Sequence, residues 1–469
     1  MSDYSVAVIG AGPGGYVAAI RCAQLGLPTV CIEKWRDEND QLSLGGTCLN
    51  VGCIPSKALL DSTHLYETLC KEAQDHGIKV SGSVVDLNVM HSRKDQIIKN
   101  FSGGIGSLFE KNGVDSLFGS ASFVDEHTLE IETLDQGKKT ITADHIIIAT
   151  GSVPVTLEQF PNGESVADNA GALNFDEVPV DLGIVGAGVI GLELGSVWRR
   201  LGSNVTILEM SPQFLPAVDR EISREALKLY SKQGLDIKLG AQITETDVDD
   251  DYVSVSYTDA KGEHEVEFDK LIVAVGRKPN TNKLNLEKIN VKVDERGFIA
   301  TNNLCQTNIK HIYAIGDVTA GPMLAHRASK DGMHAAENIN GDQHGSDYAN
   351  IPWIIYTWPE IAWCGQTEEE LKAAGIDYQK GKFPFMANGR AHAMNSAEGK
   401  IKILTDSIGL VLGVHIIGPN ASELIAAGVS AMEKGQTYHD IINEIHAHPT
   451  LSEAIHEAAL DIEKRTIHI

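Results

Sequence analysis

The chain has 469 residues, of which 42% are hydrophobic and 22% charged, a balance typical of a globular protein with a full core. Disordered, collagen-like and fibrous classes are therefore excluded, and the length predicts about three domains. Because 39 Lys and Arg residues stand against 64 Asp and Glu residues, the formal net charge is −25. Such an acidic surface disfavours nucleic acids and anionic membranes as partners, whereas small anions can still bind backbone amides at helix N-termini.

The N-terminus shows no cationic targeting segment, because residues 1–4 (MSDY) lead directly into an apolar run. The longest nearly apolar stretch, 182–198, contains Glu193 and five glycines, so we expect no membrane-spanning helix. Seven cysteines in a chain of this length do not form the framework of a secreted disulfide-rich protein. We therefore expect a cytoplasmic protein.

An internal repeat dominates the organisation of the chain. Residues 6–33 and 182–209 each contain a short apolar strand, a glycine-rich turn, an amphipathic helix and a second strand that ends in glutamate. A second similar pair follows, the apolar runs at 144–154 and 269–280, each of which leads into glycine and proline. The repeat predicts an α/β fold with two Rossmann-like dinucleotide-binding domains, the second inserted into the first.

The composition changes near 351–353, where aromatic residues cluster. Strand-like and helix-like runs alternate from there to the C-terminus, which predicts a C-terminal α+β domain of about 120 residues. We therefore assign the first dinucleotide-binding domain to 1–153 and 281–350, the second to 154–280, and the C-terminal domain to 351–469.

The first glycine-rich turn has the residues that a dinucleotide site requires. Gly10, Gly12 and Gly15 lie between a strand and a helix, and Glu33 ends the next strand. Glycines permit the tight turn and let the backbone approach a pyrophosphate, and the helix N-terminus attracts the negative charge. The carboxylate can accept hydrogen bonds from a ribose. One such motif is a weak signal, but here strand, helix and acidic residue recur in both copies.

The second copy contains Gly186, Gly188, Gly191 and Glu209. Glu209 would repel a ribose 2′-phosphate, and residues 201–219 contain no Lys or Arg to bind one. The second site is therefore predicted to hold NAD(H) rather than NADP(H), unless a basic residue reaches it from a distant loop.

Cys48 and Cys53 lie five positions apart in the segment GGTCLNVGCIPSK (45–57). This spacing allows a small, strained and reducible disulfide across a distorted helical turn. A reduced pair near a helix N-terminus would have lowered thiol pKa values. Two packed structural cysteines remain the alternative. A zinc site lacks a matching second cysteine pair, and we predict no metal site.

The segment HAHPTLSE (446–453) places His448 just before a helix start expected at Pro449. Glu453 follows about a turn later, so its carboxylate can orient the imidazole for general acid–base work on a thiol. His446 and His456 compete for this role, and a solvated histidine beside a helix acid is the alternative. Spacing alone does not choose among them.

Together these segments resemble the flavoprotein disulfide reductase family over nearly the full length of the chain. The resemblance is carried by the redox motif GGTCLNVGCIPSK, the flavin motifs GAGPGG (10–15), ATG (149–151) and AIGDV (314–318), and the acid–base motif HPTLSE (448–453). It implies FAD at the first repeat, NAD at the second, and a C-terminal domain that forms a homodimer. It also implies that His448 is the active base, that Glu453 orients it, and that this pair works in the active site of the opposite subunit.

The resemblance further implies roles for single residues. Cys48 is the implied interchange thiol that reacts with substrate, and Cys53 the thiol that passes electrons to the flavin. Lys57 resembles the family's lysine near flavin N5, which pairs with a glutamate at the position of Glu193. The other implied cofactor-binding residues are Thr150, Gly151, Gly276, Asp317 as the ribityl ligand, and Ala325 with His326 as the backbone contact beside the flavin ring.

Within the family, IPSKALL (54–60), PMLAHRASKDG (322–332) and YTWPEIAWCG (356–365) resemble the enzymes that oxidise dihydrolipoamide. Mercuric reductases would end in an extra cysteine pair, whereas this chain ends in KRTIHI. Glutathione reductases need a basic NADPH pocket, which the surroundings of Glu209 do not supply. The resemblance thus implies oxidation of protein-bound dihydrolipoamide by NAD⁺, through the Cys48–Cys53 disulfide and FAD. One departure from the family pattern is the polar stretch WRDENDQLS (35–43), expected to enlarge a surface loop.

The implied partners are a second copy of the chain, lipoyl domains, the acyltransferase core of 2-oxoacid dehydrogenase complexes and the lipoyl protein of glycine cleavage. The sequence does not show which of these complexes the protein serves. Three alternatives stay open: a nicotinamide transhydrogenase, another disulfide reductase, and a role mainly as an assembly component. The intact cysteine pair argues against a transhydrogenase, and Glu209 argues against another disulfide reductase. A role in assembly does not exclude catalysis.

Overall fold

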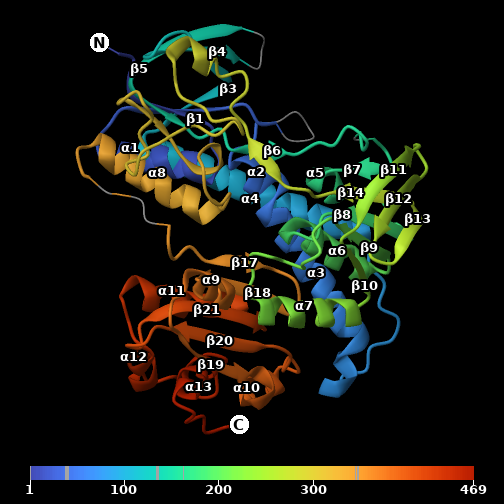
Figure 1. Ribbon diagram of the computed structural model, residues 1–469. Helices are drawn as coiled ribbons and strands as arrows, with labels where there is room; N and C mark the ends of the chain where they lie inside the picture. Colours follow the sequence, from blue (N-terminus) through green and yellow to red (C-terminus); the bar gives the residue numbers. More distant parts are fainter. Residues whose placement is uncertain (1, 37–41, 134–136, 162, 344, 346–347) are drawn as a thin grey trace. The chain divides into compact units, whose positions relative to one another are not determined.

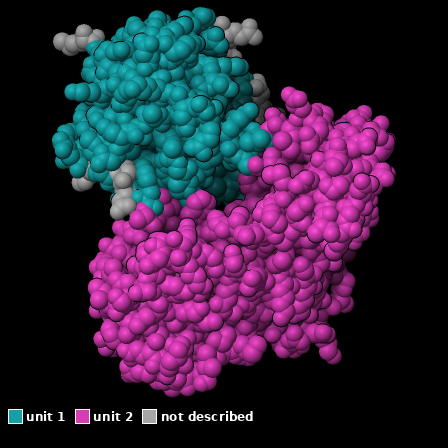
Figure 2. Space-filling view, in the orientation of Figure 1, with its two compact units in different colours: residues 1–58, 91–155, 276–348 teal, residues 59–90, 156–275, 349–469 magenta. Residues whose placement is uncertain are grey.

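The computed structural model describes residues 2–36, 42–133, 137–161, 163–343, 345 and 348–469 (Figure 1). The chain divides into two compact units, shown in different colours in Figure 2. Unit 1 contains residues 1–58, 91–155 and 276–348, and unit 2 contains residues 59–90, 156–275 and 349–469. Most of the stretch expected to enlarge a surface loop, 37–41, lies outside the described residues. The division into domains at 1–153, 154–280, 281–350 and 351–469 stays a prediction.

A six-stranded sheet forms the centre of unit 1. Its parallel strands have the order β3 (Asp115–Phe123), β2 (Thr29–Glu33), β1 (Tyr4–Ile9), β5 (Lys138–Ile148) and β16 (Ile312–Ala314), and β4 (Thr128–Thr133) pairs antiparallel with β3 and β5. Side chains of β1 alternate between two cores, because Ala7 and Ile9 face one buried cluster and Val6 and Val8 the other. Burial on both faces explains why the strand reads as a continuous apolar run.

Helices α1 (Pro13–Gln24) and α8 (Ala325–Ile339) pack closely in unit 1 because glycines meet at their contact. A Cβ at Gly332 would lie 2.4 Å from the carbonyl oxygen of Gly14, and a Cβ at Gly14 would lie 3.0 Å from the carbonyl oxygen of Ala328. The short helix α2 (Gly46–Val51) precedes α3 (Cys53–Lys71) and α4 (Leu87–Asn112), and strands β6 (Ser152–Pro154) and β15 (Arg277–Pro279) form an antiparallel pair. The start of α8 is thereby fixed beside the glycine-rich turn that opens α1.

Unit 2 begins with a second parallel sheet. Its order is β10 (Leu235–Leu239), β9 (Asn204–Glu209), β8 (Asp181–Val185), β14 (Lys270–Val273) and β7 (Val166–Ala167). The helices of this part are α5 (Asn169–Ala172), α6 (Val189–Leu201) and α7 (Arg220–Lys232). An antiparallel sheet of β11 (Gln242–Val248), β12 (Val253–Asp259) and β13 (Gly262–Phe268) completes it.

The C-terminal part of unit 2 contains an antiparallel sheet with the order β17 (Trp353–Ile355), β18 (Glu360–Gly365), β21 (Val411–Gly418), β20 (Lys400–Thr405) and β19 (Gln379–Pro384). Its helices are α9 (Glu368–Ala374), α10 (Gly389–Ala393), α11 (Ala421–Glu433), α12 (Tyr438–Asn443) and α13 (Glu453–Ile462). The predicted fold class, two Rossmann-like sheets and a C-terminal α+β part, is confirmed. Across the described ranges, the helices are all too short or too polar to cross a membrane.

Candidate active site

The first glycine-rich turn joins β1 to α1 and has the shape of a phosphate cradle. Gly10 has a φ of +104°, and a Cβ there would lie 2.4 Å from the carbonyl oxygen of Ala149, so only glycine fits. A Cβ at Gly15 would lie 1.8 Å from the carbonyl oxygen of Gly10. A Cβ at Gly12, by contrast, would meet no atom nearer than 3.9 Å. Packing therefore does not require glycine at that position, and the space beside Gly12 at the start of α1 is open.

The turn between β8 and α6 in unit 2 repeats this geometry. Gly186 also has a φ of +104°, and a Cβ there would lie 2.5 Å from the carbonyl oxygen of Ala274. A Cβ at Gly191 would lie 2.0 Å from the carbonyl oxygen of Gly186, while a Cβ at Gly188 would meet nothing within 4 Å. The two turns therefore have the same structure, and in both there is open space beside the second glycine.

Glu33 and Glu209 occupy equivalent positions at the ends of β2 and β9. Oε2 of Glu33 accepts a hydrogen bond from the Ala11 N–H at 2.7 Å, and Oε2 of Glu209 accepts one from the Ala187 N–H at 2.8 Å. Oε1 of each glutamate accepts further N–H groups from the loop that follows its strand. Since a carboxylate has about four lone-pair sites, both side chains are fixed and retain capacity for a ribose hydroxyl.

Cys48 and Cys53 lie on either side of the break between α2 and α3. Gly52 forms this break, and a Cβ there would lie 3.2 Å from the Cα of Cys48. The close approach brings the two cysteine side chains, both free thiols, into hydrogen-bond contact. That hydrogen bond and then burial raise the pKa of the Cys48 thiol well above its usual range. The expectation of a lowered thiol pKa is therefore wrong for Cys48, because the Cys53 side chain and burial outweigh the Cys53 backbone N–H and the Lys57 charge, which both lower it.

The cysteine segment begins directly against the first glycine-rich turn. The Gly45 N–H donates to the carbonyl oxygen of Ala11 at 3.0 Å. Gly46 has a φ of +58°, and a Cβ there would lie 2.7 Å from the Cα of Gly12. The redox segment and the phosphate cradle thus form one continuous site within unit 1.

The second segment of this site follows β5. Thr150 donates from Oγ1 to the carbonyl oxygen of Asn280 at 2.7 Å, and the Asn280 side chain donates back to the carbonyl oxygen of Thr150 at 3.2 Å. The backbone N–H of Asn280 donates to the carbonyl oxygen of Gly151 at 2.8 Å, and the carbonyl oxygen of Gly276 accepts the Val155 N–H at 3.0 Å. The structure therefore brings together the predicted residues Thr150, Gly151 and Gly276, although they are distant in sequence.

Asp317 lies in a short 3-10 segment, Gly316–Val318, after β16. Its Oδ2 accepts a hydrogen bond from the Ser152 hydroxyl at 2.6 Å, and Arg277 donates to Oγ and to the carbonyl oxygen of Ser152, both at 2.8 Å. Ala325 is the first residue of α8, and the N-cap residue of this helix, Leu324, makes no side-chain hydrogen bond to it.

Ser152 and Arg277 were missed by the sequence reasoning. They lie on β6 and β15, which pair antiparallel with Arg277 opposite Pro154 and Pro279 opposite Ser152. The two similar runs at 144–154 and 269–280 contain these strands, so the second repeat was the signal that could have pointed to them.

Lys57 and Glu193 belong to different units. Lys57 donates from Nζ to Oγ of Ser56 at 3.4 Å. Glu193 lies on α6, is buried with 4% of its surface exposed, and accepts the Tyr356 N–H through Oε1 at 3.0 Å. The implied pairing of Lys57 with Glu193 stays a prediction.

His448 and Glu453 are hydrogen-bonded in unit 2, with Nδ1 of His448 2.8 Å from Oε1 of Glu453. The helix expected to start at Pro449 starts four residues later, since Glu453 is the first residue of α13. Oε2 of Glu453 accepts the Thr450 N–H at 2.8 Å. Burial alone would raise the pKa of Glu453, but the Thr450 N–H and His448 together lower it. Because the carboxylate binds Nδ1, Nε2 is left for proton transfer, and 80% of the His448 side chain is exposed.

The structure separates the three candidate histidines. Nε2 of His446 lies 3.4 Å from the carbonyl oxygen of Ile441, and Nε2 of His456 lies 3.2 Å from that of Ile442. Both rings are thus engaged by the backbone, whereas His448 is held by a carboxylate. The geometry favours His448 among the three.

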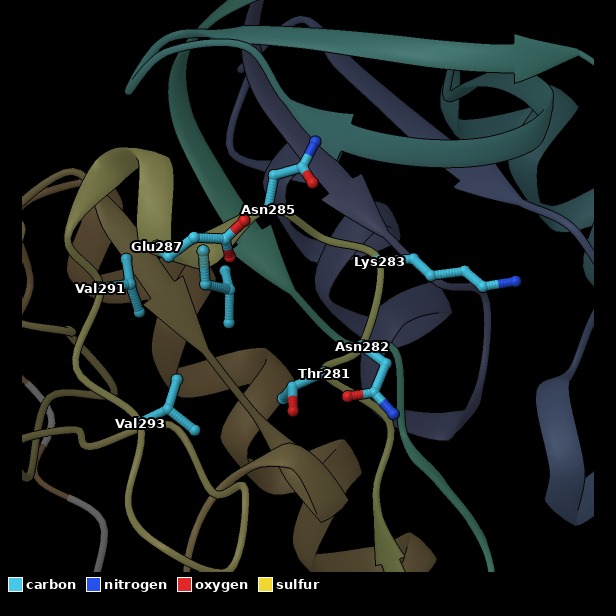
Figure 3. A pocket seen from close by; sticks show the side chains of 8 residues that line it. Thr281, Asn282, Lys283, Asn285, Glu287, Val291 and Val293 are labelled. Atoms are coloured by element: carbon cyan, nitrogen blue, oxygen red, sulfur yellow. The ribbon is translucent and has the colours of Figure 1, made fainter.

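Pocket shape does not locate this site. A pocket of about 430 Å³ in unit 1 is formed by residues 281–293, with Thr281, Lys283 and Glu287 among its lining residues (Figure 3). None of the residues predicted for the active site lines it. In the part of the chain that the structure describes, no group of three or more His, Cys, Asp or Glu residues is arranged to hold a metal ion.

Comparisons with known protein families cover most of the chain. Residues 4–332 match the family described as pyridine nucleotide-disulphide oxidoreductase. Residues 351–459 match the family described as the pyridine nucleotide-disulphide oxidoreductase dimerisation domain.

Similar proteins cover the whole chain. Dihydrolipoyl dehydrogenase of Cupriavidus necator is 49% identical over 100% of this chain and 99% of its own length. Dihydrolipoyl dehydrogenase 1, mitochondrial, of Arabidopsis thaliana is 46% identical over 100% of this chain and 92% of its own length. Leghemoglobin reductase of Vigna unguiculata is 45% identical over 98% of this chain and 87% of its own length. Among solved structures, the Cu(II) complex of the HOCl-induced flavoprotein disulfide reductase RclA from Escherichia coli has a TM-score of 0.86 at 28% identity, covering 98% of this chain and 99% of that chain.

Proposed function

We infer the function from the premise that this chain belongs to the pyridine nucleotide-disulphide oxidoreductase family, and that relatives named dihydrolipoyl dehydrogenase match its full length at up to 49% identity. The chain is an oxidoreductase that oxidises dihydrolipoamide to lipoamide with NAD⁺, through FAD and a redox-active disulfide. The observation that carries this function is the continuity of the redox segment with the phosphate cradle, where Gly46 packs against Gly12.

The residues present fit both cofactors. We propose that FAD binds the first glycine-rich turn, Glu33, the segments at 150–151 and 276–280, Asp317 and the start of α8. We propose that NAD⁺ binds the second turn and Glu209, which accepts ribose hydroxyls and disfavours a 2′-phosphate. FAD supplies a two-electron acceptor between a dithiol couple and the nicotinamide couple. The open positions at Gly12 and Gly188 support this assignment, because packing does not require glycine at either.

In the proposed thiol half-reaction, His448 accepts the proton of one substrate thiol at Nε2, and Glu453 stabilises the imidazolium. The substrate thiolate attacks Sγ of Cys48, which breaks the Cys48–Cys53 disulfide and forms a mixed disulfide. The second substrate thiol closes the lipoamide ring and releases Cys48. Both cysteines end reduced. Cys48 takes the proton of the second substrate thiol as it is released, His448 keeps the first proton, and Cys53, the leaving group of the first attack, is left as the thiolate that passes electrons onward.

We further propose that the enzyme is a homodimer in the cytoplasm. The match of 351–459 to a dimerisation domain supports the homodimer. The family resemblance supports a site in which His448 and Glu453 serve the cysteines of the opposite subunit. We propose lipoyl domains and the acyltransferase core of a 2-oxoacid dehydrogenase complex, or the lipoyl protein of glycine cleavage, as partners. The net charge of −25 fits docking to a basic binding domain.

The first test is anaerobic NADH formation from dihydrolipoamide and NAD⁺, with NADP⁺ in a parallel reaction. We expect rapid turnover that is selective for NAD⁺. Absence of turnover by FAD-loaded protein would refute the proposed substrate, and equal use of NADP⁺ would refute the role of Glu209.

Variants then test the residues. Cys48→Ser and Cys53→Ser should each abolish lipoamide turnover while FAD stays bound, whereas Cys70→Ser, at an exposed cysteine of α3, should not. His448→Gln should slow the thiol half-reaction far more than dye reduction by NADH. The matched control is His439→Gln, because His439 is also exposed and lies 3.6 Å from a carboxylate. Full activity of either cysteine variant, or equal slowing of both reactions in His448→Gln, would contradict the assignment.

A further inference from the structure

A row of basic side chains lies on one face of α7. Arg220, Arg224 and Lys228 follow one another at intervals of four residues, so they share that face. All three are exposed, and none of their side chains forms an ion pair with a described residue. We call these three residues the α7 basic stripe.

The α7 basic stripe lines an open pocket of about 740 Å³ within unit 2. The other charged residues that line it are Lys372, Lys400, Lys402, Glu221, Glu225, Glu368 and Glu369. Glu221, Glu225 and Glu368 are each paired with a lysine of the same pocket, at 3.3, 2.7 and 2.6 Å. The fourth carboxylate, Glu369, accepts the backbone N–H of Arg220 at 3.1 Å. The unpaired cations are thus those of the stripe.

Helix stability does not explain this arrangement. Like charges four residues apart repel and destabilise a helix. Glu221 and Glu225, three residues before Arg224 and Lys228, would offset this repulsion, but both carboxylates bind Lys400 instead. Arg220 is the first residue of α7 and lies at the positive end of the helix dipole, where an acidic residue would be favoured. The chain has 64 acidic residues against 39 basic ones, yet three unpaired cations are grouped here. A ligand of opposite charge accounts for such a group.

Buried ion pairs hold the start of α7, the helix that carries the α7 basic stripe. Lys402 is 1% exposed, and its Nζ lies 2.8 Å from Asp219 and 2.6 Å from Glu368. Asp219 caps the N-terminus of α7 by accepting the Glu221 N–H at 3.0 Å, and Glu368 is the first residue of α9. Because one buried lysine ties both helix starts together, binding at the stripe orders little besides the three exposed side chains.

We propose that the α7 basic stripe and its pocket form a docking site for an acidic polypeptide segment of a partner protein. From Arg220 to Lys228 the stripe rises by eight residues along the helix, which is about 12 Å. That length matches about four residues of extended chain, so the segment carries several Asp or Glu residues within one short stretch. A long nucleic acid is disfavoured, because beyond the stripe it would meet the surface of a chain with a net charge of −25. Its ligand therefore has the opposite charge to the basic binding domain proposed above as a partner.

The test measures binding of a fluorescein-labelled peptide of alternating Glu and Ser to the FAD-loaded enzyme by fluorescence anisotropy at low and physiological salt. The combined variant Arg220→Gln, Arg224→Gln and Lys228→Gln should bind the peptide at least about tenfold more weakly, since each exposed charge pair contributes a modest share. The matched control is Lys288→Gln, Lys292→Gln and Lys310→Gln, which removes the same charge from exposed positions of unit 1. It should leave binding within about twofold.

Dihydrolipoamide turnover should be unchanged in the stripe variant, since none of its positions touches the proposed active site. The melting temperature should not fall, because the substitutions remove like-charge repulsion along α7. The single variants Arg224→Gln and Lys228→Gln provide the same comparison if the triple variant does not fold. Wild-type binding by the stripe variants, or an equal loss in the control variant, would overturn the proposal. Tighter binding of a single-stranded DNA of equal charge would also overturn it, and so would a changed oligomeric state of the stripe variant in sedimentation, which would assign the site to a second copy of the chain.

Discussion

Replacing Gly188 by alanine tests the assignment of the second glycine-rich turn to NAD⁺. Gly188 is the N-cap of α6 with φ of −78° and ψ of −174°, which alanine adopts without strain, and a Cβ there meets no atom within 4 Å. The folded chain therefore accepts the methyl group. We expect the free energy of unfolding to change by less than about 0.5 kcal/mol.

In the proposed NAD⁺ site, the methyl group would instead occupy the open space beside the start of α6, where our assignment places the pyrophosphate. The first hydrogen bond of this helix runs from the Leu192 N–H to the carbonyl oxygen of Gly188 at 3.0 Å, so the preceding N–H groups have no partner within the helix. Loss of one charge-assisted hydrogen bond to the dinucleotide costs about 1.5–3 kcal/mol. The KM for NAD⁺ should therefore rise roughly ten- to hundredfold, with a smaller effect on kcat at saturating NAD⁺.

The assay is steady-state NADH formation with NAD⁺ varied at saturating dihydrolipoamide, together with thermal unfolding of the same samples. Gly389→Ala is the matched control, because Gly389 begins α10 and a Cβ there also meets nothing within 4 Å. An unchanged KM in a normally folded Gly188→Ala variant, or an equal rise in the Gly389→Ala control, would refute the reasoning.

Two further predictions concern the buried ion pairs beneath α7. Lys402→Met should lower the free energy of unfolding by about 3–5 kcal/mol in urea, because it leaves Asp219 and Glu368 without their buried cation. Lys380→Met removes a partly exposed lysine 2.9 Å from the same Glu368, so it should lower the free energy of unfolding by less than about 1 kcal/mol. Similar losses in the two variants would show that burial does not set the contribution of these lysines. Burial raises the pKa of Glu368, but its lysine partners outweigh this and lower the pKa well below the ordinary value. A carboxyl with a lowered folded-state pKa stabilises the fold above its unfolded-state pKa and loses this contribution as the pH falls. Stability should therefore decline below about pH 5, and Glu368→Gln should decline less steeply, whereas parallel pH profiles would count against the pKa assignment.

Local features of the chain were predicted well from its sequence. The glycine-rich turns belong to single strand–turn–helix units, in which backbone geometry over a few residues requires glycine at Gly10 and Gly186. The apolar runs and turns likewise predicted the two Rossmann-like sheets and the C-terminal α+β part, because hydrophobic period and turn chemistry act over short distances. The five-residue spacing of Cys48 and Cys53 predicted their closeness for the same reason.

Long-range packing decided the rest. Spacing left three candidate histidines, and only the folded chain engages the rings of His446 and His456 with backbone carbonyls and leaves His448 to a carboxylate. The contact of Asp317 with Ser152 joins residues 165 positions apart, and Lys402 meets Asp219 across 183 positions. Such pairs depend on how whole elements pack.

The Cys48–Cys53 pair shows most clearly which property the sequence alone does not determine. The sequence by itself determined that two cysteines stand close together near a helix start, which predicts lowered pKa values. Only the tertiary structure decided the direction for Cys48, because its pKa depends on the hydrogen bond with Cys53 and on burial. Burial is set by segments that are distant in sequence, and the free energy of a charge depends on that complete environment.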